Sequence, residues 1–339
     1  MNKLSKRYGR QTVLFANPVG IAAGASVVGP KEGEGPLSMY FDQVEKDSMF
    51  GTESWEKAES KFAKTAADLA AKKADAAMKD FDYLIAGDLL NQSTGSIFGL
   101  RETGVPYLGI FGACSAMGEG LGLGAMLIDG GFAQKIICVA SSHFCSAEKQ
   151  FRFPLEFGAQ RPPTSSWTVT GAAAMILVDK PTGPCVVGAT TGKMVDMGVS
   201  DPNNMGAAMA GAAADTMASH FVDTGRSPDY YDLIVTGDLG HIGSELMLSL
   251  LKKKGFNIAS NHRDCGIEIY DKSTQDTHAG GSGCACSGVT FASHFYEKMK
   301  QGKLGKILFV PTGALMSPIS VQQGESIPGI AHAVVVENV

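Results

Sequence analysis

Charged side chains are scarce in this 339-residue sequence, at 19% of the residues, against roughly 25% in average globular domains. Because hydrophobic residues reach 44%, the composition excludes a disordered chain, a fibrous repeat and a charged coiled coil. No basic stripe appears and the net charge is -5, which argues against a surface that binds nucleic acids. The sequence predicts a folded globular protein, long enough for one large domain or two fused subdomains.

Neither a secretory signal nor a membrane-spanning segment is expected. The first seven residues are basic, but no apolar stretch follows them, which argues against a signal peptide. The longest weakly charged stretch, residues 103–128, contains Pro106, Glu119 and seven glycines. It fits a buried strand, a turn and a helix better than a membrane span. We therefore expect the protein to remain inside the cell.

Disulfide bonds are not expected either. The seven cysteines are an odd number and lie mostly inside apolar runs, which favours buried free thiols over a disulfide framework. Glycine is abundant instead: the 42 glycines gather in short runs inside apolar segments, as they do where backbones pass close to each other or to a ligand. These runs predict tight turns around a site.

A long helix is expected over residues 54–79, where Ala58, Phe62, Ala66 and Leu69 recur at helical spacing between Lys and Glu residues. The apolar run that follows ends in turn residues at Gly87 and Asp88, which predicts a buried parallel strand. This alternation is typical of an α/β fold.

An internal repeat predicts two similar halves. Residues 82–89 read DYLIAGDL and residues 232–239 read DLIVTGDL, and a Gly/Cys turn, a helix and a strand recur in residues 112–139 and 283–310. Each half has the expected order strand, Gly-Asp turn, strand, Gly/Cys turn, helix, strand, with an insertion in the second half near residues 254–271. We expect an N-terminal half of residues 1–180 and a C-terminal half of residues 181–339. Chance similarity between two buried segments is the alternative.

Cys114 is the first candidate for chemistry. A short apolar strand enters a tight turn at Gly112, and Cys114 lies where the next helix is expected to begin. Unpaired N–H groups and the helix dipole favour a thiolate at such a position, which lowers the thiol pKa and makes the sulfur a nucleophile. The alternative is a small buried thiol that fills space beside glycine. The segment alone does not separate the two interpretations.

His241 is the second candidate. It lies in the polar turn that follows the second copy of the repeated strand, and it could reach a site at the carboxyl ends of the strands, where open parallel sheets place ligands. A His in such a turn is more often a surface or capping residue, which is the alternative.

The glycine turn at residues 278–287 is the third candidate. It contains Ser282, Gly283 and Cys284 and opens another helix. Its backbone N–H groups could cradle an anion, or the turn could serve packing alone. Cys284 and Cys286 are too close together for the usual zinc knuckle, so no metal site is predicted.

Taken together, the duplicated halves, the three turns and the ending at residues 310–316 resemble the thiolase and ketoacyl synthase III superfamily over nearly the whole chain. The resemblance implies a five-layered α-β-α-β-α fold and a homodimer, with an acyl-bearing Cys114 and a catalytic His241. Where the superfamily places an Asn or a His in the late glycine turn, this chain has Ser282, and no Cys stands in the last Gly-rich loop. Since a missing oxyanion donor can cost roughly 10²- to 10³-fold in rate, it stays open whether the protein is an enzyme.

Three segments, residues 86–92, 141–144 and 151–156, more closely resemble the stage V sporulation protein AD family of endospore-forming bacteria. This resemblance implies a protein that binds dipicolinic acid, pyridine-2,6-dicarboxylate. It also implies that the protein assists uptake of the acid into the developing endospore together with membrane-embedded partners. The expected location is therefore peripheral, on the cytoplasmic face of the spore inner membrane.

The ligand site implied by this resemblance lies where the two Gly/Cys turns converge. Their helix N-termini would offer backbone donors and two positive dipole ends to a small dianion. The predicted ligand-binding residues are Cys114, His241, Ser282, Gly283, Cys284, Asp88 and Asn91. No cofactor is expected, and a calcium ion that accompanies the ligand is left open. The alternatives are an acyltransferase that forms a thioester on Cys114, with His241 as base, and a scaffold whose pocket stays empty.

Overall fold

A computed structural model describes residues 6–152 and 160–339 of the chain. Its main sheet contains β1 (Arg7–Tyr8), β2 (Thr12–Val28), β3 (Gln43–Val44), β4 (Tyr83–Gly87), β5 (Tyr107–Gly109), β6 (Lys135–Ser142), β8 (Gly171–Val178), β9 (Pro184–Thr190), β10 (Leu233–Thr236), β11 (His262–Asp264), β13 (Lys306–Val310) and β16 (Ala333–Asn338). Two small sheets pair β7 (Trp167–Thr168) with β12 (Gly281–Ser282) and β14 (Thr312–Ala314) with β15 (Gly329–Ala331).

The strand order of the main sheet is itself duplicated. It runs β11-β10-β13-β16-β9-β2-β8-β6-β4-β5. On one side β4 pairs in parallel with β5 and β6, and β6 pairs antiparallel with β8. On the other side β10 pairs in parallel with β11 and β13, and β13 pairs antiparallel with β16. The copies of the sequence repeat therefore occupy equivalent strands, and antiparallel pairing of β2 with β9 joins the two sides. The expected boundary at residue 180 falls between β8 and β9.

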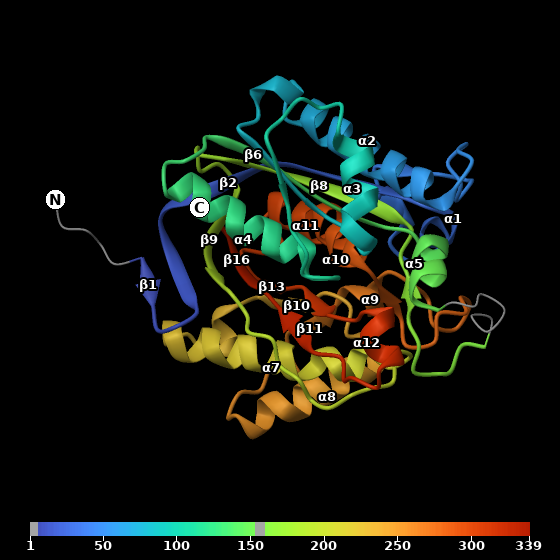
Figure 1. The fold of residues 1–339 in the computed structure, drawn as a ribbon. Helices are drawn as coiled ribbons and strands as arrows, with labels where there is room; N and C mark the ends of the chain where they lie inside the picture. The colour runs from blue at the N-terminus through green and yellow to red at the C-terminus, as the bar shows by residue number, and fades with distance from the viewer. Residues whose placement is uncertain (1–5, 153–159) are drawn as a thin grey trace.

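Helices add three layers to these two sides of the sheet, as Figure 1 shows. The outer layers are α2 (Trp55–Lys73) with α3 (Thr94–Leu100) and α7 (Met205–Thr224) with α8 (Gly240–Lys253). The middle layer holds α4 (Ala116–Asp129), α10 (Cys284–Thr290) and α11 (Tyr296–Lys300). The shorter helices are α1 (Pro30–Gly33), α5 (Phe144–Phe151), α9 (Cys265–Glu268) and α12 (Pro318–Gln322). The five-layered α-β-α-β-α fold predicted from the resemblance is confirmed.

The helix expected over residues 54–79 is shorter than predicted. It begins after Ser54, whose hydroxyl accepts a hydrogen bond from the Lys57 N–H at 3.3 Å, as an N-cap does. It ends at Lys73, because Asp75 takes a positive φ of 50° that no helix can continue through. Its buried alanines allow the helix to lie close to β2 and β8.

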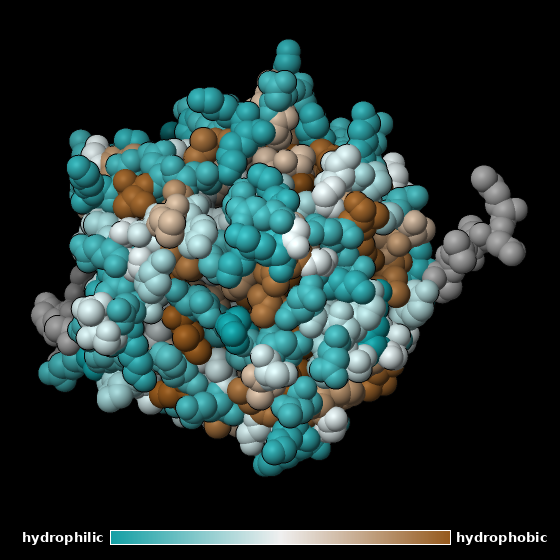
Figure 2. Space-filling model, turned by 180° about the vertical axis from the view of Figure 1, so that it is seen from behind, coloured by the Kyte–Doolittle hydropathy of each residue, from teal (hydrophilic) through white to brown (hydrophobic). Residues whose placement is uncertain are grey.

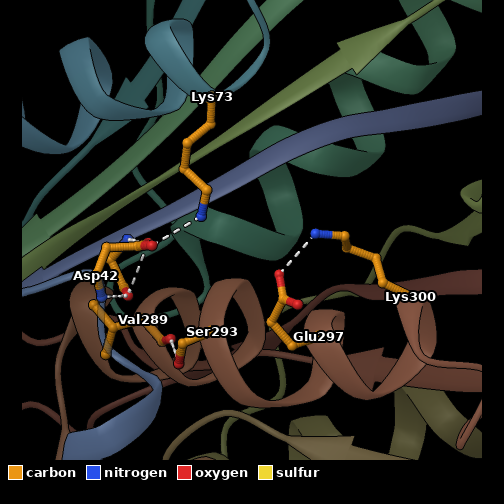
Figure 3. A network of polar contacts seen from close by, with 7 residues as sticks. Asp42, Lys73, Val289, Ser293, Glu297 and Lys300 are labelled. Carbon is orange, nitrogen blue, oxygen red and sulfur yellow. Dashed lines mark hydrogen bonds and ion pairs between the residues drawn. The ribbon is translucent and has the colours of Figure 1, made fainter.

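Polar contacts hold several of these elements in place (Figure 3). Lys73 at the end of α2 forms an ion pair of 2.9 Å with Asp42, whose other oxygen accepts the Ser26 N–H of β2. Between α10 and α11 the chain forms a π-helical turn, Phe291–Phe295, in which the Ser293 hydroxyl donates to the Val289 carbonyl at 2.6 Å. This side-chain bond to the preceding turn competes with the regular helical bonds. Within residues 6–152 and 160–339, no helix combines the length and apolar character needed to cross a membrane.

Candidate functional site

Cys114 lies in a strained turn between β5 and α4. Ala113 adopts a positive φ of 48°, and the Ser115 hydroxyl donates to the Gly112 carbonyl at 2.6 Å. Gly313 of β14 packs directly on this turn, since a Cβ atom added there would lie 2.2 Å from the Gly112 oxygen. The turn holds Cys114 at the start of α4, with 5% of its surface exposed.

The two Gly/Cys turns meet in the structure. Gly283, with a φ of 100°, leads from β12 into α10, and Cys284 begins that helix. The Cys284 thiol donates to the Ala113 carbonyl at 3.0 Å, so segments far apart in the sequence are in direct contact. The convergence of these turns is therefore as the sequence predicts.

Asp238, which is not among the predicted site residues, is the acid next to Cys114. It follows β10, and 1% of its surface is exposed. Its carboxylate accepts a hydrogen bond of 2.7 Å from the Thr312 hydroxyl and one of 3.1 Å from the Gly283 N–H. It also contacts the thiol of Cys114. Burial raises the pKa of Asp238 to about 7, although the hydrogen bonds oppose this shift.

The Cys114 thiol is therefore not activated in the way its position suggested. Burial, followed by the charge of Asp238, raises the pKa of Cys114 well above its ordinary value. This is the opposite of the lowering expected at a helix N-terminus. Loss of hydration and a neighbouring carboxylate both penalise a thiolate, and here they outweigh the dipole of α4. All seven cysteines are free thiols, as predicted.

A cavity of about 40 Å³ opens beside Cys114. Its lining residues are Leu89, Phe111, Ala113, Cys114, Ala147, Glu148, Phe151, Arg152, Ser166, Thr168, Pro202, Met205, Ser282, Ala314 and Met316. Cys114 and Ser282 are the two predicted site residues among them, whereas Gly283 and Cys284 are buried behind them. The walls are mostly apolar, and Arg152 and Glu148 are their charged members.

Arg152 is the cation among the described residues that line this cavity. Its Nε lies 3.5 Å from the Glu148 carboxylate, while its Nη1 is buried and has no hydrogen-bond partner among the described residues. Arg161, whose side chain is 7% exposed, also acts on Glu148 and has two buried nitrogens, Nε and Nη2, without a partner in the described part of the chain. Arg161 is not a lining residue. Because a buried guanidinium nitrogen without an acceptor is costly, the Arg152 side of the cavity is suited to an anion.

His241 lies outside the cavity lining. Its N–H donates to the Ala279 carbonyl at 2.9 Å in the first turn of α8, and burial and nearby Lys272 lower its pKa. The turn directs Asp238 inward instead, because Asp264 binds the N–H groups of Leu239 and Gly240, each at 3.0 Å. The residue next to Cys114 is thus Asp238, which precedes the predicted His241 by three positions.

Asp88 and Asn91 do not reach the cavity either. The Asp88 carboxylate accepts the N–H groups of Leu90 and Ser96 at 2.8 and 2.7 Å, which holds the loop after β4. Asn91 is exposed and lines a separate groove beside α5. From this loop, Leu89 lines the cavity.

Two signals in the sequence could have found the missed residues. Asp238 ends the second copy of the repeated strand, as Asp88 ends the first, and Arg152 lies in one of the three segments with the closer family resemblance. No group of three or more His, Cys, Asp or Glu side chains in the described ranges is arranged to hold a metal ion.

Comparison with known proteins gives a consistent result. Residues 9–337 match the model of the family described as stage V sporulation protein AD. The chain is 43% identical to stage V sporulation protein AD of Bacillus subtilis (strain 168) over 332 residues, which cover 98% of each protein.

Solved structures of low sequence identity share the fold. Acetamide-bound OleA of Xanthomonas campestris gives a TM-score of 0.61 at 16% identity, over 96% of this chain and 100% of that one. The 3-oxoacyl-[acyl-carrier-protein] synthase III of Aquifex aeolicus VF5 gives a TM-score of 0.57 at 14% identity, over 94% of this chain and 99% of that one. At these identities the likeness concerns the thiolase-like architecture alone.

Proposed function

Because the chain belongs to the stage V sporulation protein AD family, we propose that it binds dipicolinic acid in the cavity beside Cys114 and assists its uptake into the developing endospore. The observation that carries this proposal is Arg152. Arg152 lines the cavity, and its buried Nη1 has no acceptor in the described chain. A ligand carboxylate that moves in beside the guanidinium would supply one.

The remaining walls suit the rest of the ligand. Phe111, Phe151 and Met316 offer apolar surface to the pyridine ring. The second carboxylate would lie near the Ser282 hydroxyl and the N-terminus of α4, which both lie at the Cys114 side. A volume of about 40 Å³ holds a few water molecules, so binding requires side chains of the wall to move apart. Phe111, 53% exposed, is free to do so.

Calorimetry with dipicolinate tests the proposal. We expect saturable binding that weakens about ten- to a hundredfold in Arg152→Gln, because a charge-assisted hydrogen bond contributes about 1.5–3 kcal/mol. Arg263→Gln is the matched control, since Arg263 is exposed on β11 and lies outside the cavity lining. Pyridine-2-carboxylate, with a single carboxylate, should bind more weakly than dipicolinate. Parallel titrations with and without calcium show whether the ion accompanies the ligand. Absence of binding in both, or equal binding by Arg152→Gln, would refute the proposal.

A second candidate function is acyl transfer through Cys114, and the contact with Asp238 is the observation that favours it. A carboxylate with a pKa of about 7 could take the thiol proton near neutral pH. In that case Asp238, rather than His241, would act as the base. A thioester adduct on Cys114 after incubation with an acyl-CoA, detected by mass spectrometry, would support this function. We rank it second, because burial disfavours the thiolate it requires.

We further propose that two copies of the chain pair through the open edge of β5. This outermost strand pairs with β4 on its inner side, so its outer backbone groups face away from the sheet. Exposed apolar side chains surround it, namely Ile97, Phe98, Tyr107 and Leu108. On the side of the molecule shown in Figure 2, apolar side chains form small areas separated by hydrophilic ones.

Sedimentation of two variants tests this pairing. Leu108→Asp should convert a dimer to a monomer, because the charge would be buried between the copies. Phe132→Asp, at a side chain that is 72% exposed in the turn after α4, should leave the dimer intact. A monomeric wild-type protein would refute the proposal. Membrane-embedded sporulation proteins remain the proposed partners at the cytoplasmic face of the spore inner membrane, and co-purification from sporulating cells would test them.

A further inference from the structure

Asp238 is a buried acid that lies one side chain away from the cavity. Its carboxylate contacts the thiol of Cys114, and that thiol lines the cavity. The proposed guest carries two negative charges, of which Arg152 can meet one. A ligand carboxylate bound beside Cys114 would therefore lie close to the buried carboxyl group of Asp238. Only the sulfur atom of Cys114 would separate the two.

The groups that face Asp238 are neutral or acidic. The turn before α4 contributes Cys114, and the start of α10 contributes the Gly283 N–H together with the thiols of Cys284 and Cys286. The β14 strand contributes the Thr312 hydroxyl. On the remaining side, the end of β11 and the start of α9 contribute Asp264 and Cys265, both buried.

Among the described residues, hydrogen bonds are what stabilises the charge of Asp238. Thr312 and Gly283 stabilise the ionised carboxylate, whereas burial and the charge of Asp264 favour the protonated acid. His241 lies in the same turn, but the charged groups that act on it are Lys272 and Glu245. An additional anion placed beside Cys114 would shift this balance towards the protonated acid, because like charges at short range repel strongly in a site of low dielectric constant.

We propose that the ligand enters the cavity together with one proton, which binds to the carboxylate of Asp238. The inference rests on the proposed function and adds its regulation by pH. In the free protein the Cys114 S–H donates to the ionised carboxylate. When Asp238 binds the proton, its O–H donates to the sulfur and the S–H turns to the guest carboxylate, so one proton is taken up and no covalent bond changes. A thiol can act as donor and acceptor in this way.

The expected result is a specific pH dependence of affinity. Ordinary carboxylic acids have pKa values near 4, so dipicolinate remains a dianion between pH 6 and 9. The dissociation constant should be constant while Asp238 is already protonated, below about pH 7. Above that pH it should rise by up to about tenfold per pH unit, which is the limit for uptake of one proton.

Calorimetry of the wild-type full chain in pairs of buffers with different ionisation enthalpies counts the protons directly. Uptake approaching one proton per dipicolinate at pH 8, and little uptake at pH 6, would support the inference. Binding that takes up no proton at pH 8 would overturn it and leave the proposed function intact. Failure to bind dipicolinate at any pH would overturn both.

Two variants separate Asp238 from other acids. Asp238→Asn should abolish the dependence of affinity on pH. If that variant does not fold, the number of protons that the wild-type protein takes up per dipicolinate tests the inference by itself. Glu59→Gln is the control, because Glu59 is buried, has a pKa of about 8 and lies apart from the cavity lining, where it accepts hydrogen bonds from Ser141 and Ser146. It should retain the wild-type pH dependence. A pH dependence lost in Glu59→Gln and retained in Asp238→Asn would overturn the assignment.

Discussion

Replacing Thr312 by valine offers the sharpest test of how Asp238 is held. The Thr312 hydroxyl donates to one oxygen of the Asp238 carboxylate at 2.7 Å, while the Gly283 N–H holds the other oxygen. Valine has nearly the same shape as threonine, so Thr312→Val changes the packing little. It removes the donor to the carboxylate and also the acceptor of a longer bond, 3.3 Å, from the Asp238 N–H. The carboxylate loses stabilisation and its protonated form does not, so the pKa of Asp238 should rise.

The size of this rise follows from the hydrogen bond that is lost. A hydrogen bond to a charged group contributes about 1.5–3 kcal/mol, and one pKa unit corresponds to about 1.36 kcal/mol. The pKa of Asp238, about 7 in the wild type, should therefore increase by roughly one to two units. The pH above which dipicolinate affinity declines should increase by the same amount, which titration calorimetry between pH 6 and 9 would measure.

Thr290→Val is the matched control for this experiment. The Thr290 hydroxyl is buried in α10 and has no hydrogen-bond partner among the described residues, so its loss should not move the pH profile. Thermal melting would show that both variants are folded. A profile that stays in place in Thr312→Val, or that moves to lower pH, would refute the argument that this hydroxyl stabilises the ionised acid.

Three further predictions concern reactivity and stability. Iodoacetamide should modify the half-buried Cys145 before Cys114, because burial and Asp238 raise the pKa of Cys114. Peptide mass spectrometry after timed labelling would show the order of modification. Faster labelling of Cys114 would contradict the prediction. Burial, and secondarily the charge of Asp88, raises the pKa of Glu59 to about 8. The stabilisation that protonated Glu59 gives the folded protein is therefore complete below the ordinary pKa of a glutamate and is lost as the pH rises through 8. The melting temperature of Glu59→Gln should therefore fall less between pH 6 and pH 9 than that of the wild type, and an equal fall would argue against it. Gly313→Ala should destabilise the protein in urea by about 1–3 kcal/mol, because its Cβ would lie 2.2 Å from the Gly112 oxygen. Gly122→Ala in α4, where the nearest atom lies at 3.5 Å, should be neutral or stabilising, and equal effects of the two changes would refute the packing argument.

Much of the fold was predictable because its signals are local or repeated. The copied strands ending in Asp88 and Asp238 predicted the duplicated strand order, and the Gly/Cys turns predicted which helices meet in the middle layer. The end of α2 was not predictable, because Asp75 takes its positive φ in a stretch whose alanines all favour a helix.

The site was harder to predict, because it depends on which side chain of a turn faces inward. Asp238 faces inward because Asp264, from the neighbouring strand β11, binds the next two N–H groups of the turn. The direction of the Cys114 pKa shift likewise depends on burial and on Asp238, whereas the helix dipole that suggested the opposite direction is a local property of the sequence.

The position of β16 has a consequence for how the chain folds. This strand, Ala333–Asn338, lies between β13 and β9, so the sheet is completed only when this segment has docked. In a chain that lacks it, two inner strand edges stay unsatisfied and able to pair with other chains. Removal of residues 333–338 would therefore produce an aggregation-prone polypeptide rather than a slightly shortened working protein.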